Sequence, residues 1–358
     1  MRTILLFFCF VFFSSLLFGQ QMSGISFLGN STAAFAQTKS AAFIKGAKPQ
    51  GLQLEYFKLW NSQENINACN CIAKSGIALS YFNLGMPNLL GNALIASLFM
   101  EPQFEMSNRY IIGIKAHAGF VYANKKFDSN TNPGNLTYSS NISNYLALGL
   151  SNYYFINPKT ALNLSFIFNH ISNGGLKNPN HGLNFPGINF GLNYYFEKPN
   201  YHYSVSAKSK IDPAIAKYIT VFYSATTANS YSTKRYAIFG LELSGVKKIN
   251  GVLFSTTAIS LYQDKAVQQR LKQDSVSVQN QYRCGIASGI GFNMGKANFA
   301  SSLGVYVYDP INYYARIYHQ HEISYQLNKQ WAVGINLKAH TYIANYTDIR
   351  IKYLLIQH

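Results

Sequence analysis

Apolar and polar residues alternate along much of this 358-residue chain, so that every second side chain over long stretches is apolar. Alternation at a period of two is the pattern of a β-strand with one face in an apolar medium and the other in a polar one. Leu164 and Phe166, for example, lie on one face of a predicted strand and Asn163 lies on the other. The clearest stretches of this kind are 110–122, 144–155, 162–172, 186–197 and 331–340.

These predicted strands are long, and about ten residues is the length that a tilted strand needs to cross a bilayer. Their second face is rich in Gly, Asn, Ser and Lys, and aromatic residues cluster at strand ends, as in Tyr153-Tyr154-Phe155 and Tyr194-Tyr195-Phe196. A large soluble β-sandwich also alternates, but it does not normally have such aromatic ends. The pattern therefore predicts an all-β fold, an antiparallel transmembrane β-barrel of about 12–16 strands at roughly 20 residues per strand and connection.

The connections between the predicted strands fall into two classes. Short turns are predicted at 156–159, 197–200, 247–251 and 295–298, and long polar connections at 124–143 and 264–282.

No internal repeat is evident, so we expect one barrel domain over residues 20–358, with a fusion of two smaller sheets as the alternative. Residues 22–50 have no clean pattern, and the sequence leaves open whether they form a plug, a tail or a loop.

The composition narrows the class of protein further. Hydrophobic residues make up 48% of the chain and charged residues 12%, yet mean hydropathy is only -0.02, so apolar residues are interleaved with polar ones. The longest apolar run is Ile4–Phe18, which follows Arg2. That order predicts a signal peptide over residues 1–19 rather than a membrane anchor, and therefore export.

The formal net charge of +17 at pH 7 points first to nucleic acid. Here the basic residues are scattered along an exported chain, so we expect no nucleic-acid partner. Phosphate-bearing lipid head groups of the outer membrane are the better match for this charge.

Three cysteines remain after the signal peptide. Cys69 and Cys71 are too close in the chain for an unstrained bond to each other, so we expect Cys284 to be bonded to one of them in an oxidising compartment.

Two residues with complementary chemistry lie at the end of the predicted strand 162–172. His170 and Ser172 are two apart and share its apolar face, so their side chains emerge about 6–7 Å apart on the lipid-facing side. A serine beside an imidazole is a nucleophile beside its base. The connection that follows is long, whereas short turns face the periplasm, so the pair is predicted at the extracellular rim. The parity of the next strand puts Asn184 on the same outer face, where it can meet His170.

The same segment reads His170-x-Ser172-Asn173-x-Gly175, followed by Asn178-Pro179-Asn180 and Gly182. It resembles the active site of PagL-type lipid A 3-O-deacylases, acyloxyacyl hydrolases of the outer membrane that are small eight-stranded barrels. The resemblance covers about residues 70–215 as barrel. It implies that Ser172 is the nucleophile, that His170 is the general base, and that Asn173 and Gly175 form the oxyanion hole.

The chain departs from that family at the position of the acid, where Asn184 stands in place of the expected Glu. An asparagine can orient an imidazole but does not offset its positive charge, and in a serine triad the change from Asp to Asn costs about 10⁴ in rate. Glu197 is no substitute, because it is predicted at the opposite rim.

We therefore expect an outer-membrane esterase that removes an acyl chain from lipid A of lipopolysaccharide, a carboxylic ester hydrolase that needs no metal or other cofactor. Its partners would be lipopolysaccharide and outer-membrane lipids, and its location the bacterial cell outer membrane. The alternative is a non-catalytic barrel, either a porin-like channel or a structural component. An open lumen would favour the alternative, and a filled lumen with His170, Ser172 and Asn184 together on the outer wall would favour the enzyme.

Overall fold

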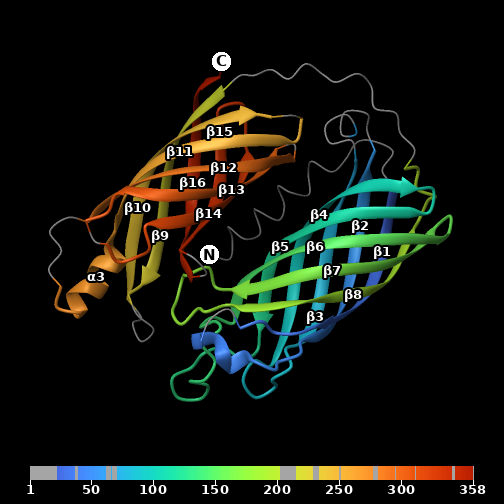
Figure 1. Cartoon of the computed structure of the whole chain (residues 1–358), viewed down its shortest axis with the longest axis horizontal. Helices are drawn as coiled ribbons and strands as arrows, with labels where there is room; N and C mark the ends of the chain where they lie inside the picture. Colours follow the sequence, from blue (N-terminus) through green and yellow to red (C-terminus); the bar gives the residue numbers. More distant parts are fainter. Residues whose placement is uncertain are drawn as a thin grey trace.

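The computed structural model consists of two closed antiparallel β-barrels of eight strands each (Figure 1). The all-β barrel prediction is confirmed, and the sixteen strands lie at the upper end of the expected range. They close as two barrels rather than one, which was the alternative that the sequence left open. The structure describes residues 22–36, 39–61, 66, 71–201, 215–228, 234–249, 251–276, 281–294, 296–310, 312–340 and 343–357.

The first barrel closes by pairing of its first and eighth strands, with Phe27 opposite Leu192. Between its first two strands lies the 3-10 helix η1 (Lys39–Ile44). Its strands are β1 (Met22–Thr32), β2 (Gln50–Trp60), β3 (Ile72–Asn83), β4 (Asn92–Ser107), β5 (Tyr110–Ala123), β6 (Ile142–Asn157), β7 (Thr160–Ser172) and β8 (Leu183–Tyr195).

The second barrel closes in the same way, with Ile351 of its last strand opposite Val221 of its first. The helix α3 (Lys265–Gln273) follows its third strand and is capped by the carboxylate of Asp264. Its strands are β9 (Ile215–Thr227), β10 (Arg235–Lys248), β11 (Leu253–Asp264), β12 (Tyr282–Met294), β13 (Ala297–Tyr308), β14 (Ile317–Gln326), β15 (Trp331–His340) and β16 (Ile343–Gln357).

Residues 22–50 are not a plug or a tail, because β1 occupies their first part and pairs with both β2 and β8. The strand was hard to recognise because Leu28 is fully buried on the polar face, which interrupts the alternation. The predicted signal peptide, residues 1–19, lies outside the described residues.

The predicted bond from Cys284 to Cys69 or Cys71 is wrong. Cys284 is a free thiol on β12 of the second barrel, while Cys71 precedes β3 of the first barrel and is itself disulfide-bonded. Because Cys284 is free, it takes part in neither of the predicted bonds. Cys69 lies outside the described residues.

Ionic side chains fill both barrels from within. In the first, Lys115 lies 2.9 Å from Glu55 and 3.6 Å from Glu101, and all three are buried. In the second, Arg350 lies 3.0 Å from Glu242 and 2.6 Å from Asp348. With these side chains inside, the described part of neither barrel has the open lumen expected of a channel.

The outer faces of both barrels are apolar, as a lipid-facing wall requires. Leu148 is 60% exposed on the first barrel and Ile349 is 65% exposed on the second. None of the helices described is long and apolar enough to span a membrane. Figure 1 shows η1 and α3 at the same, lower end of the view, which is the end where the longer loop 124–141 and the β7–β8 loop also lie.

Candidate active site

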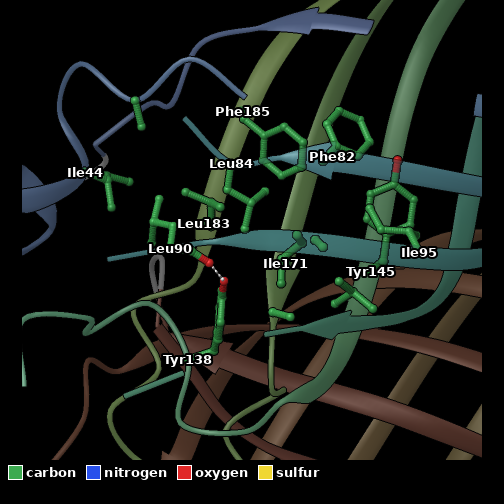
Figure 2. Packing of buried hydrophobic residues seen from close by; sticks show 14 of the residues in the cluster. Ile44, Phe82, Leu84, Leu90, Ile95, Tyr138, Tyr145, Ile171, Leu183 and Phe185 are labelled. Carbon is green, nitrogen blue, oxygen red and sulfur yellow. Dashed lines mark hydrogen bonds between the residues drawn. The ribbon is translucent and has the colours of Figure 1, made fainter. Parts of the chain in front are cut away.

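A buried apolar cluster fixes the ends of β7 and β8 at the mouth of the first barrel. Ile171, Leu183 and Phe185 point inward and are fully buried in it. Figure 2 shows these residues converging with Phe82, whose ring meets that of Phe185 edge-on at 5.4 Å between centroids. Because side chains alternate along a strand, this anchoring turns the residues beside them outward.

His170 and Asn184 are the residues next to this cluster that face outward, one on β7 and one on β8. They stand directly opposite each other in the β7–β8 register, and Nδ1 of His170 lies 2.6 Å from Oδ1 of Asn184. The predicted contact is therefore confirmed. Since an amide oxygen only accepts, Nδ1 is the protonated nitrogen of the ring, and Nε2 is left as an acceptor.

Ser172 continues the same outer face of β7 but is only 4% exposed, because the loop after it covers it. Its Oγ accepts a hydrogen bond from the Gly174 N–H at 3.4 Å. No hydrogen bond joins Ser172 to His170 among the described residues. The imidazole is thus already oriented, while the hydroxyl must turn towards Nε2, as is common in enzymes without substrate.

The loop 173–182 contains the two predicted oxyanion-hole residues. The backbone N–H of Asn173 donates to Asn180 at 2.8 Å, and its side-chain amide donates to Ser139 and to the Lys177 carbonyl. In the part of the chain that the structure describes, the Gly175 N–H has no acceptor. Gly175 is therefore the donor that remains available, and Asn173 holds the loop together.

Gly182 is required by its contact with the imidazole. Its φ is +73°, and a Cβ at this position would lie 2.9 Å from Cε1 of His170. Any side chain here would displace the ring from Asn184.

The loop 124–141 supports the β7–β8 loop from the side. The N–H groups of His181 and Gly182 donate to the carbonyls of Leu136 and Thr137 at 3.0 and 2.8 Å. Partial burial lowers the pKa of the His181 imidazole, which favours its neutral form. Another histidine of this barrel, His117, lies in the lumen against Ser97.

Sequence reasoning missed one neighbour of the site, Asn144. It stands directly opposite Ser172 in the β6–β7 register, on the same outer face as Leu146 and Leu148. A Cβ on Gly174 would lie 2.8 Å from its Nδ2. The parity of β6 would have revealed this polar residue at the end of an otherwise apolar face.

An apolar groove lies on the outer wall, directly below the imidazole on the same strands. It is shallow and open to the outside, with a volume of about 670 Å³. Among its lining residues, Phe168 is two positions before His170 on β7, and Pro186 is two positions after Asn184 on β8. The groove therefore begins next to His170 and Asn184. It is lined by Ile114, Leu148, Gly149, Leu150, Phe166, Ile167, Phe168, Pro186, Gly187 and Ile188.

Metal ligands do not gather anywhere in the described ranges, where no three His, Cys, Asp or Glu side chains lie close enough to share an ion. Glu197 follows the end of β8, at the opposite rim from His170, as predicted.

Comparison with known proteins assigns both barrels. Residues 52–193 match the model of the family described as lipid A 3-O-deacylase (PagL), and residues 216–357 match that described as acyloxyacyl hydrolase, C-terminal domain. No curated protein matches the chain. The two family models together extend over most of both barrels.

Solved structures that the comparison matches to this chain include mutant forms of the porin of Rhodopseudomonas blastica. Two of them share 9% identity with this chain, cover 93% and 94% of it and 100% of their own length, and have TM-scores of 0.22 and 0.21. A third shares 7% identity over 93% of this chain and 100% of its own, with a TM-score of 0.18. The assignment rests on the family models alone: the chain belongs to the outer-membrane β-barrel family of PagL lipid A 3-O-deacylases and acyloxyacyl hydrolases, and each of its two barrels is a domain of that family.

Proposed function

We propose that the first barrel hydrolyses an acyl ester of lipid A in lipopolysaccharide, from the lipid side of its wall in the bacterial outer membrane. The observation that supports this most directly is the His170–Asn184 pair, joined at 2.6 Å on the outer face and adjacent to an apolar groove. An oriented imidazole at a lipid-facing rim has no structural purpose that a hydrophobic residue would not serve better.

The proposed reaction is an acyl transfer through Ser172. Nε2 of His170 accepts the Ser172 proton as Oγ attacks the ester carbonyl, and the tetrahedral intermediate places its negative charge on the former carbonyl oxygen. The Gly175 N–H donates to that oxygen. Collapse breaks the ester bond, His170 returns the proton to the departing sugar hydroxyl, and water then hydrolyses the acyl-enzyme by the same route.

Asn173 has a second proposed role in the oxyanion hole. Its side-chain amide now donates to Ser139 at 3.1 Å and to the Lys177 carbonyl at 2.6 Å, so it would have to release one of them to reach the oxyanion. Its part in catalysis therefore stays a prediction, and Gly175 is the donor on which we rely.

The groove supplies the binding energy for the acyl chain. Its outward side chains face lipid, and the groove extends along the barrel wall from the rim, which is the direction that an acyl chain of lipid A takes from its ester. An acyl chain in the groove would bring its carbonyl to the rim, beside Ser172 and His170. This arrangement also explains why the pair is on the outside of the barrel rather than in the lumen.

A channel function has no supporting observation. Buried ion pairs such as Lys115–Glu55 cross the lumen of the first barrel, and Arg350 contacts Glu242 and Asp348 in the second. Paired side chains inside both barrels are not what the open lumen of a channel requires.

The proposal predicts that the purified protein in detergent removes one acyl chain from lipopolysaccharide. Mass spectrometry of lipid A before and after incubation should show the loss of one acyl group, together with release of the matching free fatty acid. A fluorophosphonate probe should label Ser172. Intact lipid A after long incubation, with no label on the protein, would contradict the function.

Filling the groove should change the preference for acyl chain length. Ile188→Trp introduces a large ring into the groove, whereas Leu192→Trp, on the same outer face of β8, lies outside it. We expect Ile188→Trp to lower kcat/KM about tenfold for long-chain esters and much less for short ones, as the loss of about 1–2 methylene contacts predicts. Leu192→Trp should behave as wild type. Equal effects of the two variants on all chain lengths would show that the groove does not hold the chain.

A further inference from the structure

The loop that follows Ser172 is bonded to the second barrel. The hydroxyl of Thr347, on β16, donates to the Gly174 carbonyl at 2.9 Å, and that of Thr226, on β9, donates to the Gly175 carbonyl at 2.5 Å. A third bond runs from the backbone N–H of Asn178 to the hydroxyl of Thr227 at 3.3 Å. Three threonines of one barrel therefore hold the backbone of the proposed catalytic loop of the other.

The contact is also a close steric fit. Gly174 and Gly175 have φ values of +66° and +74°, which side chains rarely adopt. A Cβ on Gly175 would lie 2.6 Å from the carbonyl oxygen of Asn345, and one on Gly174 would meet the Thr347 hydroxyl. The two glycines thus allow the loop to approach the second barrel, as well as to turn.

These bonds determine the direction of the proposed oxyanion donor. A peptide unit is planar and trans, so its C=O and the N–H of the next residue point in opposite directions. When Thr347 holds the Gly174 carbonyl, the N–H of Gly175 in the same plane is directed away from Thr347. Thr226 fixes the next peptide plane in the same way.

Further hydrogen bonds hold the backbone around these threonines in place. β9 and β16 are neighbours in the barrel, and the hydroxyl of Ser224 donates to the Thr347 carbonyl at 2.6 Å. From α3, Arg270 donates to the Thr227 carbonyl at 3.2 Å and to the Tyr314 hydroxyl at 3.0 Å. Because these contacts fix the threonines, the threonines can in turn fix the position of the loop.

The second barrel has no equivalent site of its own on its seventh strand. β15 ends at His340, which is 5% exposed, and its ring stacks on those of Tyr306 and Tyr314. Since β7 is the seventh strand of the first barrel, the matching histidine of the second points inward rather than to lipid.

We propose that the second barrel is a positioning domain for the active site of the first, and that Thr226 and Thr347 are its positioning residues. They orient the Gly174–Gly175 and Gly175–Leu176 peptides and so direct the Gly175 N–H at the reacting carbonyl. This inference rests on the proposed function, because it assigns the loop a part in the reaction.

The test is the double variant Thr226→Val/Thr347→Val, which removes both donors with little change in shape. We expect kcat on lipopolysaccharide to fall about 10–100-fold, because small displacements of a catalytic donor have effects of this size. KM should change less than twofold, since the groove is untouched. Thr226→Ser/Thr347→Ser keeps the hydroxyls and should restore kcat. Thr220→Val, a buried position on the same β9, should behave as wild type.

Amide hydrogen exchange provides a readout that does not depend on activity. Exchange over residues 173–178 should be faster in the double valine variant and slow in the double serine variant and in Thr220→Val. Wild-type kcat or unchanged exchange in the double valine variant would overturn the inference while the function stands. An inactive wild type would instead overturn the proposed function, and the catalytic role of the loop with it.

Discussion

Replacing Ser172 by alanine is expected to abolish deacylation, with a loss of about 10⁴-fold or more. The acyl-enzyme cannot form without Oγ, and removal of a serine nucleophile eliminates nearly all the contribution of its catalytic group. The barrel should fold as before, because within the described part of the chain Oγ makes only one hydrogen bond, the long one from the Gly174 N–H at 3.4 Å. Lipid A mass spectrometry measures the loss, and the shift of the folded barrel on heating in gels reports the fold.

Ser165→Ala is the matched control. Ser165 lies on the same strand β7 but points into the lumen, where its hydroxyl donates to Asn163 at 2.7 Å. This variant should keep wild-type deacylation. Undiminished activity in Ser172→Ala would eliminate the serine mechanism, whatever the control does.

Asn184→Glu is expected to raise activity at neutral pH by about 10²–10⁴-fold. A neutral amide orients His170 but does not stabilise the imidazolium that forms as Ser172 attacks, and the reverse change in serine triads costs about 10⁴. A glutamate restores the negative charge that this family has at the third position. Its carboxylate can accept the Nδ1 proton from the same strand position, opposite His170 in the register.

Asn184→Gln separates charge from length. It has the extra methylene of glutamate but no charge, so it should show no gain and should lower activity by disturbing the 2.6 Å contact. Comparable activity in the Glu and Gln variants would mean that charge at this position is irrelevant. A complete lack of activity in Asn184→Glu would favour the non-catalytic barrel.

Strand parity predicted the outer wall of the site well. Leu164, Phe166 and Phe168 are exposed on β7 as expected, and the register brings His170 to Asn184. These features depend on residues close in sequence, where a period of two fixes the face. The same local rule could have predicted Asn144, had it been applied to β6.

The way in which the strands close into barrels could not be predicted from the sequence, for a different reason. Whether sixteen strands form one sheet or two depends on which strands meet over long range, such as β1 with β8 and β9 with β16. The strands on either side of the linker have the same local pattern, so no window of sequence contains the answer. The contacts of the loop after Ser172 were hidden for the same reason, because Thr226 and Thr347, which donate to it, belong to the other barrel.

The lumen of the first barrel contains two buried carboxylates, Glu55 and Glu101, and two buried ammonium groups, Lys74 and Lys115, within 2.9–3.9 Å of one another. An ion crossing this ring would have to separate opposite charges in a medium of low dielectric constant, which costs several kcal/mol for each charge exposed. The ring of paired charges therefore opposes the passage of ions through the first barrel.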